Sequence, residues 1–395
     1  MRVALIAVAY PPVRSSVAVQ MRDLAQEFAR QGHEPVMMVP DETLRRPWSL
    51  EEQDGVQVLR LRALPIRDIG YLARTITEFL LPWAMLRGLA RSPLSSQRWD
   101  AVVWYSPSIF FGPLVTKLKS RSNCRSYLIL RDIFPEWAVD LGLMKRGLAY
   151  RIFKMIERQQ HDAADTIGIQ APSNSEYLGA NGSRPDQRVE VLWNWLAPAP
   201  DKGCSIEIDA TPLAGRTILV YAGNMGVAQG VDVLLELAGR LHSREDIGFL
   251  FVGRGSEVER LRSTAAKRGL DNVLFRDEVD PTEIPGLLAQ CHIGLLALDP
   301  RHKTHNIPGK FLTYLRAGLP VLARINANND LVGLIESEGV GRVEAGASLD
   351  DLASLAIAMV DDPAGREAMA ARGKSLAQRL FSPSAAVHQI LTALR

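Results

Sequence analysis

Residues 217–230 carry the sequence TILVYAGNMGVAQG, in which an apolar run leads directly into a turn with three glycines. A short apolar run between turn residues is typical of a strand buried in a parallel sheet. Glycines at the turn let backbone N–H groups approach a diphosphate at the start of the next helix. A turn that only needs a positive φ has the same composition. The segment therefore predicts a strand and a turn, and it leaves open whether the turn binds a ligand.

Similar strands alternate with helical segments on both sides of this one. The expected strands are 3–9, 35–39, 101–105 and 126–130 before it, and 247–252, 272–275, 293–298 and 320–323 after it. Strands that are joined by helices form parallel sheets, because each connection has to cross back over one face. We therefore expect an α/β protein with two doubly wound, Rossmann-like domains.

A segment rich in proline, alanine, glycine and acidic residues separates the two series of strands. The length of 395 residues also exceeds what one hydrophobic core usually serves. We expect a first domain at 1–197, a linker at 198–215 and a second domain at 216–375. A C-terminal helix at 376–395 can cross back to the first domain. The active site is expected in the crevice between the domains.

Charge is unevenly distributed along the chain. Residues 1–200 hold 25 Lys and Arg against 20 Asp and Glu, whereas residues 201–395 hold 21 against 24. This imbalance is too small for a nucleic-acid-binding protein, but it suits a first domain that faces anionic lipid or a phosphorylated acceptor. The three cysteines show no Cys-x-x-Cys spacing, which indicates a reduced compartment and no structural zinc.

Residues 71–91 form an apolar stretch that contains Pro82 and the basic residues Arg74, Arg87 and Arg91. Such a stretch, broken at the proline, is either a pair of helices packed on the sheet or a helix lying in a membrane interface. No run of the sequence reaches the roughly 18 uninterrupted apolar residues of a membrane-spanning helix. We expect a cytoplasmic protein that is peripheral at the inner face of the cell membrane.

Two further motifs in the second half fit a nucleotide site. The first is Gly253-Arg254-Gly255, a glycine turn after the expected strand at 247–252. Two such turns at successive strand ends present backbone to the same crevice, and a nucleotide is the economical explanation. The second motif places Lys310 in the first turn of a helix, where a cation opposes the macrodipole unless an anion lies there. We interpret Lys310 as a phosphate ligand, with a surface lysine as the alternative.

In the first half, the segment 131–137 follows an expected strand and combines charged with bulky aromatic side chains. Strand ends are where an α/β domain keeps its working residues. Asp132 or Glu136 could accept the proton of an acceptor hydroxyl, and Trp137 could line a sugar. The alternative is a helix N-terminus that Asp132 caps.

Together these motifs make the whole chain similar to glycosyltransferase family 4 of the GT-B fold. The resemblance is carried by Tyr10-Pro11-Pro12, Gly32-His33, Asp132-Ile133-Phe134-Pro135-Glu136, Trp193-Asn194-Trp195, Gly223-Asn224-Met225-Gly226 with Gln229-Gly230, Val252-Gly253-Arg254-Gly255, and Pro308 and Lys310 with Gly318 and Pro320. The Asp-x-x-Pro-Glu and Gly-Asn-x-Gly-x-x-Gln-Gly forms most resemble enzymes of envelope polysaccharides, including N-acetylfucosaminyl transferases of O-antigen and capsule assembly.

With the resemblance added, residues can be given expected roles. Catalysis is expected of Asp132, Glu136 and Lys310. The donor is expected to contact Ser15, Ser16, Gly223, Asn224, Gly226, Gln229, Arg254, His305, Asn306, Pro308 and Thr313. No residue is assigned to a metal.

Two departures from the family pattern affect the donor site. Asn224 and Gln229 stand where an Arg and a Lys commonly grip the diphosphate, so that charge neutralisation falls on Lys310 and the backbone. His305 and Thr313 stand at the two positions of the Glu-x7-Glu signature. Thr313 can still hydrogen-bond a ribose hydroxyl, but His305 cannot imitate a carboxylate.

The resemblance implies a retaining, metal-independent transferase with no cofactor besides its donor. The expected donor is a UDP-sugar, with an N-acetylated amino sugar such as N-acetylfucosamine. The expected acceptor is an undecaprenyl-diphosphate-linked sugar at the membrane surface. Departure of the nucleotide diphosphate is then eased by Lys310, helix N-termini and backbone donors, which act where negative charge develops.

Two other functions fit parts of the pattern. A UDP-sugar 2-epimerase shares the GT-B fold, but it has no need for a lipid-facing helix and typically shows an acidic dyad at the sugar ring. A non-catalytic nucleotide-sugar binder would explain the missing Glu-x7-Glu signature. Turnover of a donor together with transfer to an acceptor distinguishes a transferase from both.

Overall fold

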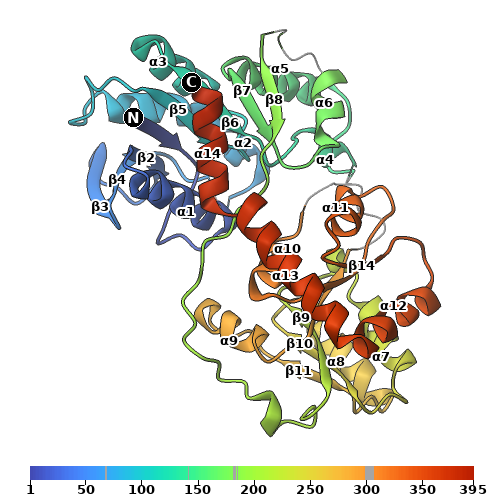
Figure 1. Ribbon diagram of the computed structural model, residues 1–395. Coiled ribbons are helices and arrows are strands. Elements are labelled where there is room, and N and C mark those ends of the chain that lie inside the picture. Colours follow the sequence, from blue (N-terminus) through green and yellow to red (C-terminus); the bar gives the residue numbers. More distant parts are fainter. Residues whose placement is uncertain (67–68, 141, 181–183, 185, 299–306) are drawn as a thin grey trace. The chain divides into compact units, whose positions relative to one another are not determined.

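The protein divides into two compact units, each with its own sheet and helices (Figure 1). The computed structural model describes residues 1–66, 69–140, 142–180, 184, 186–298 and 307–395. The first unit contains Met1–Trp195 and, at the C-terminus, Pro383–Arg395. The second contains Leu196–Ser382.

Among the described residues, the first unit has an eight-stranded sheet in the order β3-β4-β2-β1-β5-β6-β7-β8. Its strands are β1 (Arg2–Ile6), β2 (Glu34–Asp41), β3 (Trp48–Gln53), β4 (Val56–Arg62), β5 (Ala101–Tyr105), β6 (Arg125–Ile129), β7 (Thr166–Ile169) and β8 (Arg188–Val191). Only β3 and β4 pair antiparallel within this described sheet. The strand order reverses between β1 and β5, and the carboxyl ends at such a point are the usual place for ligands.

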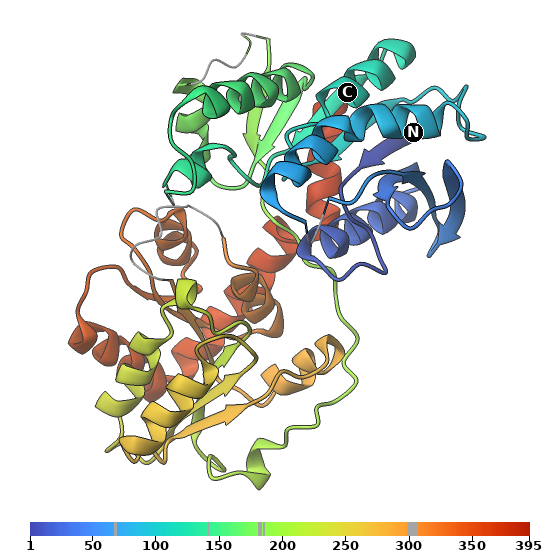
Figure 2. The same cartoon turned by 180° about the vertical axis from the view of Figure 1, so that it is seen from behind.

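Two apolar cores cover the two faces of the first sheet, because successive strand residues point to opposite sides. Val3 and Leu5 of β1 belong to the core beneath α1 and α14, whereas Ala4 and Ile6 belong to the core beneath α2 and α3. Figure 1 shows α1 and α14 in front of the sheet, and Figure 2 shows the face behind it with α2. The helices are α1 (Ser16–Arg30), α2 (Tyr71–Leu89), α3 (Gly112–Ser122), α4 (Glu136–Asp140), α5 (Leu148–Asp162), α6 (Asn174–Ala180) and α14 (Pro383–Leu394).

The described part of the second unit has a six-stranded, all-parallel sheet in the order β11-β10-β9-β12-β13-β14. The strands are β9 (Thr217–Ala222), β10 (Ile247–Val252), β11 (Val273–Arg276), β12 (Ile293–Ala297), β13 (Val321–Arg324) and β14 (Gly341–Glu344). The helices are α7 (Asp232–Arg240), α8 (Val258–Lys267), α9 (Ile284–Leu288), α10 (Gly309–Ala317), α11 (Asp330–Glu338), α12 (Leu349–Asp361) and α13 (Pro363–Leu380), with short 3-10 turns at η1 (Ile208–Ala210), η2 (Val227–Gln229) and η3 (Pro281–Glu283). The expected fold class, with two doubly wound domains, is confirmed.

The apolar stretch at 71–91 forms one helix, which excludes the pair of helices that was one of its two expected alternatives. α2 is one helix that continues through Pro82. An interior proline costs about 3 kcal/mol because it removes a hydrogen bond and crowds the preceding turn. Pro82 lies on the buried side of α2, where Leu81 and Met85 pack into the core, and this burial outweighs the cost.

The hairpin of β3 and β4 was not expected from the sequence. Asp54 and Gly55 form its turn, and both have positive φ, at 50° and 77°. Two central residues with positive φ are the mark of a type I′ turn, for which Asp-Gly is a preferred sequence. That dipeptide was the signal available in the sequence.

The C-terminal segment also differs from the expected helix at 376–395. α13 continues to Leu380, and α14 begins at Pro383. A proline cannot continue a helix because it has no N–H to donate. Between the two helices, Phe381 is buried and its ring meets that of Phe311 edge to face.

α14 should contribute strongly to the stability of the first unit, because Ile390 on its inner face is fully buried. Ile390→Ala should lower the free energy of unfolding of this unit by about 2–5 kcal/mol. All seven tryptophans lie in residues 48–195, so tryptophan fluorescence during urea unfolding reports on the first unit. Thr392→Ala, on the exposed side of α14, is the control and should change little. Equal effects of the two substitutions would contradict the packing described for α14.

Candidate functional site

Two glycine turns touch at the carboxyl edge of the second sheet. The N–H of Gly223, after β9, donates to the carbonyl of Val252 at 2.8 Å, and the N–H of Met225 donates to the carbonyl of Arg254 at 2.7 Å. Gly253 has a φ of 147°, and a Cβ there would lie 2.0 Å from the carbonyl oxygen of Gly223. Only glycine fits such an approach. The turns after β9 and β10 therefore lie side by side.

Asn224 and Gln229 shape the first of these turns. The Gln229 side-chain oxygen accepts from the Gly226 N–H and from the Asn224 amide, each at 3.0 Å. The turn then closes at Gly230, which has a left-handed φ of 58°. The two residues that replace the family's cations are thus bonded to each other and to the backbone of the turn.

Lys310 is the second residue of α10 and reaches back to the glycine turn. A Cβ added to Gly223 would meet the Lys310 side chain at 3.3 Å. Its ammonium makes no hydrogen bond or ion pair with any residue that the structure describes, and it lies 4.6 Å from the centre of the Tyr221 ring. Burial lowers the pKa of Lys310 to about 8. A partly buried cation at a helix N-terminus, with no carboxylate partner among the described residues, suits an anion site.

The second unit holds five more residues that are expected to contact the donor. Arg254 is exposed and pairs with Glu278 at 3.2 Å. Pro308 precedes α10, and the Thr313 hydroxyl donates to the carbonyl of Gly309 one turn earlier. His305 and Asn306 lie outside the described residues.

In the first unit, Arg131 and Asp132 follow β6 at its carboxyl end. The Arg131 guanidinium is buried between two rings, 5.9 Å from the centre of Tyr105 and 5.4 Å from that of Trp195. Its Nε has no hydrogen-bond partner among the described groups. Burial raises the pKa of Asp132, and the positive charge of Arg131 opposes that rise. No bond between the Asp132 carboxylate and a helix N–H occurs in the described part of the chain, so Asp132 does not cap a helix there.

Glu136 begins α4 and is held by α5. Its Oε1 accepts from the Tyr150 hydroxyl at 2.8 Å and lies 3.4 Å from the Lys154 ammonium. Lys154 also bonds Glu157 and the Tyr177 hydroxyl. Burial raises the pKa of Glu157. Glu136 is therefore part of a polar network that joins α4, α5 and α6.

Ser15 and Ser16 begin α1 after the loop that follows β1. The Ser15 hydroxyl accepts from the Ala18 N–H at 3.2 Å and so caps the helix, while Ser16 is the first helical residue. Capping uses the acceptor side of Ser15 and leaves its O–H as a donor.

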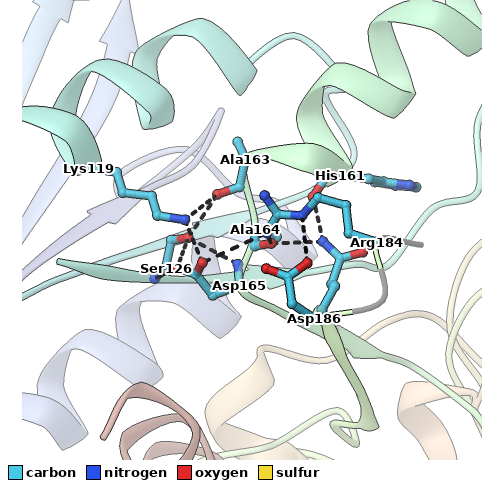
Figure 3. Close-up of polar contacts among 9 residues, drawn as sticks. Lys119, Ser126, His161, Ala163, Ala164, Asp165, Arg184 and Asp186 are labelled. Atoms are coloured by element: carbon cyan, nitrogen blue, oxygen red, sulfur yellow. Dashed lines mark hydrogen bonds and ion pairs between the residues drawn. The ribbon is translucent and has the colours of Figure 1, made fainter. Parts of the chain in front are cut away.

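A further polar cluster lies at the opposite, amino end of β6 and β7 (Figure 3). Asp165 accepts from Lys119 at 2.6 Å and from the backbone and hydroxyl of Ser126 at 2.8 and 2.9 Å. Ligands of open α/β sheets bind at the carboxyl ends of strands. We therefore regard this cluster as an attachment of α3 to the sheet.

Sequence reasoning missed two aromatic contacts to the site. Tyr221, beneath Lys310, is a buried strand residue, and nothing in the sequence distinguishes it from other strand aromatics. Trp195 lies over Arg131 and belongs to the motif Trp193-Asn194-Trp195, which offered a signal without indicating the partner. Among the described residues, no group of three or more His, Cys, Asp or Glu side chains is arranged to hold a metal ion.

Comparison with known proteins finds two family models that match successive parts of the chain. The model described as "Glycosyl transferase 4-like domain" matches residues 16–195. The model described as "Glycosyl transferases group 1" matches residues 216–362. Together the two matches cover every strand of the two sheets except β1, and they leave residues 1–15, 196–215 and 363–395 uncovered.

Individual relatives are distant. The probable glycosyltransferase WbjE of Pseudomonas aeruginosa is 23% identical over 220 residues, which are 54% of this chain and 54% of that protein. The putative colanic acid biosynthesis glycosyl transferase WcaI of Escherichia coli K12 is 23% identical over 364 residues, 85% of this chain and 86% of its own length. Among solved structures, HepE of Anabaena in complex with UDP matches with a TM-score of 0.69 at 14% identity, covering 100% of this chain and 99% of that one. This likeness supports the two-domain fold.

The contact between the glycine turns predicts that Gly253 cannot be replaced. Gly253→Ala would bring its Cβ 2.0 Å from the Gly223 carbonyl at a φ of 147°. We expect the second unit to lose about 1–3 kcal/mol of stability from backbone strain, measured by scanning calorimetry. Gly333→Ala is the control, because that glycine lies within α11 with no atom near its Cβ position. A Gly253→Ala protein as stable as the control would refute the close approach.

Proposed function

The chain belongs to the group 1 glycosyltransferases and carries their 4-like first domain, and from that premise we propose its donor, acceptor and place of action. It moves an N-acetylated amino sugar, such as N-acetylfucosamine, from UDP to an undecaprenyl-diphosphate-linked sugar. The anomeric configuration is retained, and neither a metal ion nor a cofactor takes part. The product serves O-antigen or capsule assembly at the inner face of the cell membrane.

The observation that carries the proposal is the partly buried Lys310 ammonium beside the turn of Gly223. A nucleoside diphosphate supplies the anionic partner that this ammonium lacks among the described residues. Its binding also suits the glycine turns, because backbone can approach the phosphates closely where no Cβ intervenes. UDP is proposed as the nucleotide because HepE, a protein of the same fold, is known in complex with UDP.

Transfer needs a leaving diphosphate and an oriented acceptor. The bond from C1 of the sugar to the diphosphate oxygen breaks, its electron pair stays on that oxygen, and Lys310 stabilises the charge. The acceptor oxygen forms the new bond on the same face of C1. Asp132 orients the acceptor hydroxyl, whose proton passes to Asp132 or to a donor phosphate oxygen. Burial raises the pKa of Asp132, and this makes its carboxylate a better base.

Glu136 is assigned to the same region, but with a supporting part. Its Oε1 is already held by Tyr150 and Lys154. We therefore propose that Glu136 fixes α4, which follows Asp132 in the chain, and that Asp132 alone meets the acceptor.

A lipid surface is proposed as the partner of α2. Leu72, Ile76, Phe79 and Trp83 recur at helical spacing on its outer side, with 54% to 84% of each residue exposed. Large apolar side chains that recur on the exposed side of a helix indicate an interaction surface. No helix in the described part of the chain is long and apolar enough to cross a bilayer. A helix lying in the membrane interface fits both facts.

α5 presents a second stripe of the same kind. Leu148, Ile152 and Met155 are exposed at helical spacing, and the exposed Arg151 and Arg158 lie among them. α2 and α5 both pack against α3, so the two helices lie on one face of the first sheet (Figure 2). Apolar side chains with arginines between them complement an anionic leaflet.

The class of acceptor is supported by the relatives. WcaI is named for colanic acid biosynthesis, and WbjE is named a probable glycosyltransferase. An envelope polysaccharide that grows on a lipid carrier would present its sugar at the membrane surface. The exposed stripes of α2 and α5 would bring the first unit to the same place.

Product formation tests the proposed reaction. Full-length protein is incubated with UDP-, GDP- and ADP-sugars, with and without a polyprenyl-diphosphate-linked N-acetylhexosamine, and scored for free nucleotide and a heavier lipid. We expect acceptor-dependent release of UDP from one amino-sugar donor, reduced at least a hundredfold in Lys310→Ala because the leaving charge is then unopposed. Lys267→Ala, an exposed lysine of α8, should keep full activity.

Other results would assign a different function. Inversion at C2 of the sugar without transfer would identify an epimerase. Tight UDP binding with no turnover of any donor would identify a nucleotide-sugar binder. Equal activity of Lys310→Ala and Lys267→Ala would remove Lys310 from the site.

Vesicle binding tests the membrane surface. Because Leu72 and Trp83 would insert among acyl chains, Leu72→Ser with Trp83→Ser should weaken binding to vesicles of anionic lipid at least tenfold, measured by co-sedimentation. Val19→Ser removes an exposed apolar residue from α1, on the other face of the sheet, and should bind as the wild type does. Unchanged binding of the double variant, or no binding of the wild type, would refute a lipid surface on α2.

A further inference from the structure

Tyr221 contacts both parts of the proposed diphosphate site. It lies one residue before the end of β9 and is fully buried. Its hydroxyl donates to the carbonyl of Asn224 at 2.7 Å, inside the glycine turn. The face of its ring lies 4.6 Å from the Lys310 ammonium. One side chain therefore joins the turn to the cation.

The ring offers Lys310 a partner that does not neutralise it. An aromatic face attracts a cation through its quadrupole, and this attraction strengthens where water is excluded. A carboxylate in the same place would form an ion pair and compete with any incoming phosphate. Because the ring carries no net charge, the full positive charge of Lys310 stays available to an anion.

The hydroxyl fixes one peptide of the turn. The carbonyl of Asn224 is held by Tyr221, and the N–H of the same peptide, on Met225, donates to the carbonyl of Arg254 at 2.7 Å. The N–H groups of Gly223 and Gly226 are also bonded within the protein. Among the described groups, the N–H of Asn224 has no such partner and can serve a ligand.

We propose that Tyr221 is a positioning residue of the donor site. Its ring holds the Lys310 ammonium in place while leaving it charged, and its hydroxyl sets the turn so that the Asn224 N–H and Lys310 meet the same diphosphate. The inference rests on the proposed function, in which this site binds a nucleoside diphosphate.

Two substitutions separate the ring from the hydroxyl. Tyr221→Phe keeps the ring and frees the carbonyl of Asn224, so UDP affinity should fall about fivefold while the pH at which binding weakens stays unchanged. Tyr221→Leu also removes the cation's partner, so affinity should fall at least tenfold further and binding should weaken at lower pH than in the wild type. UDP affinity is measured by calorimetry from pH 6.5 to 9.5, together with kcat and the donor KM.

Phe251→Leu is the control for lost packing. Phe251 is a fully buried aromatic residue of β10 whose ring neighbours that of Tyr221, and among the described residues it makes no cation–π contact with Lys310. The Phe251→Leu substitution should change thermal stability without changing the pH dependence of UDP binding. If Tyr221→Leu does not fold, Tyr221→Phe still tests the hydroxyl, because unchanged affinity and KM in that variant would overturn its part in the proposal.

The outcomes distinguish the positioning role of Tyr221 from the proposed function on which it rests. If the wild type binds UDP and both Tyr221 variants bind it equally well with the same pH dependence, the positioning role is wrong and the donor site stands. A shift of equal size in Phe251→Leu would also overturn the role. If the wild type binds no nucleoside diphosphate, the proposed function itself fails.

Discussion

The Lys310 ammonium is partly buried at the start of α10, and among the groups that the structure describes it faces an aromatic ring in place of a carboxylate. Removing a charge from water is costly unless it is paired, and burial accordingly lowers the pKa of Lys310 to about 8. The glycine turns pack beside this cation so closely that a side chain at Gly253 would collide with backbone. Cation and turn therefore form one arrangement, in which an anion would relieve the cost of burying the charge.

The first unit has a similar arrangement at the carboxyl end of β6, where a cation lies against aromatic rings. Arg131 is buried between Tyr105 and Trp195, and no carboxylate among the described residues forms an ion pair with it. The nearby charge of Asp132 stays separate from it, so the arginine moderates the basicity of that carboxylate without neutralising it. Each unit thus places a buried or partly buried cation against an aromatic ring at the edge where α/β sheets bind ligands.

The sequence was informative where local chemistry determines structure. Strands, helices and the two glycine turns follow from apolar periodicity and from glycines after strands. Contacts across the fold could not be read in this way. Tyr221 differs from other buried strand residues only in what lies above it, and Glu136 meets Tyr150 because two helices pack together. The outward side of α2 was also hidden, because apolar residues occupy both its buried and its exposed side and the pattern shows no preferred face. His305, which stands at one of the two positions of the Glu-x7-Glu signature that this chain lacks, lies outside the described residues.

Proton uptake on UDP binding tests the central claim most directly, because it reports the charge on Lys310 without any acceptor. Calorimetry at pH 8 in buffers of different ionisation enthalpy measures the protons taken up per UDP bound. With the pKa of Lys310 at about 8 in the free protein and raised by a bound diphosphate, about half a proton should be taken up. The uptake should vanish in Lys310→Met. Tight UDP binding to the wild type with no proton uptake would contradict the claim that the Lys310 ammonium is the diphosphate ligand.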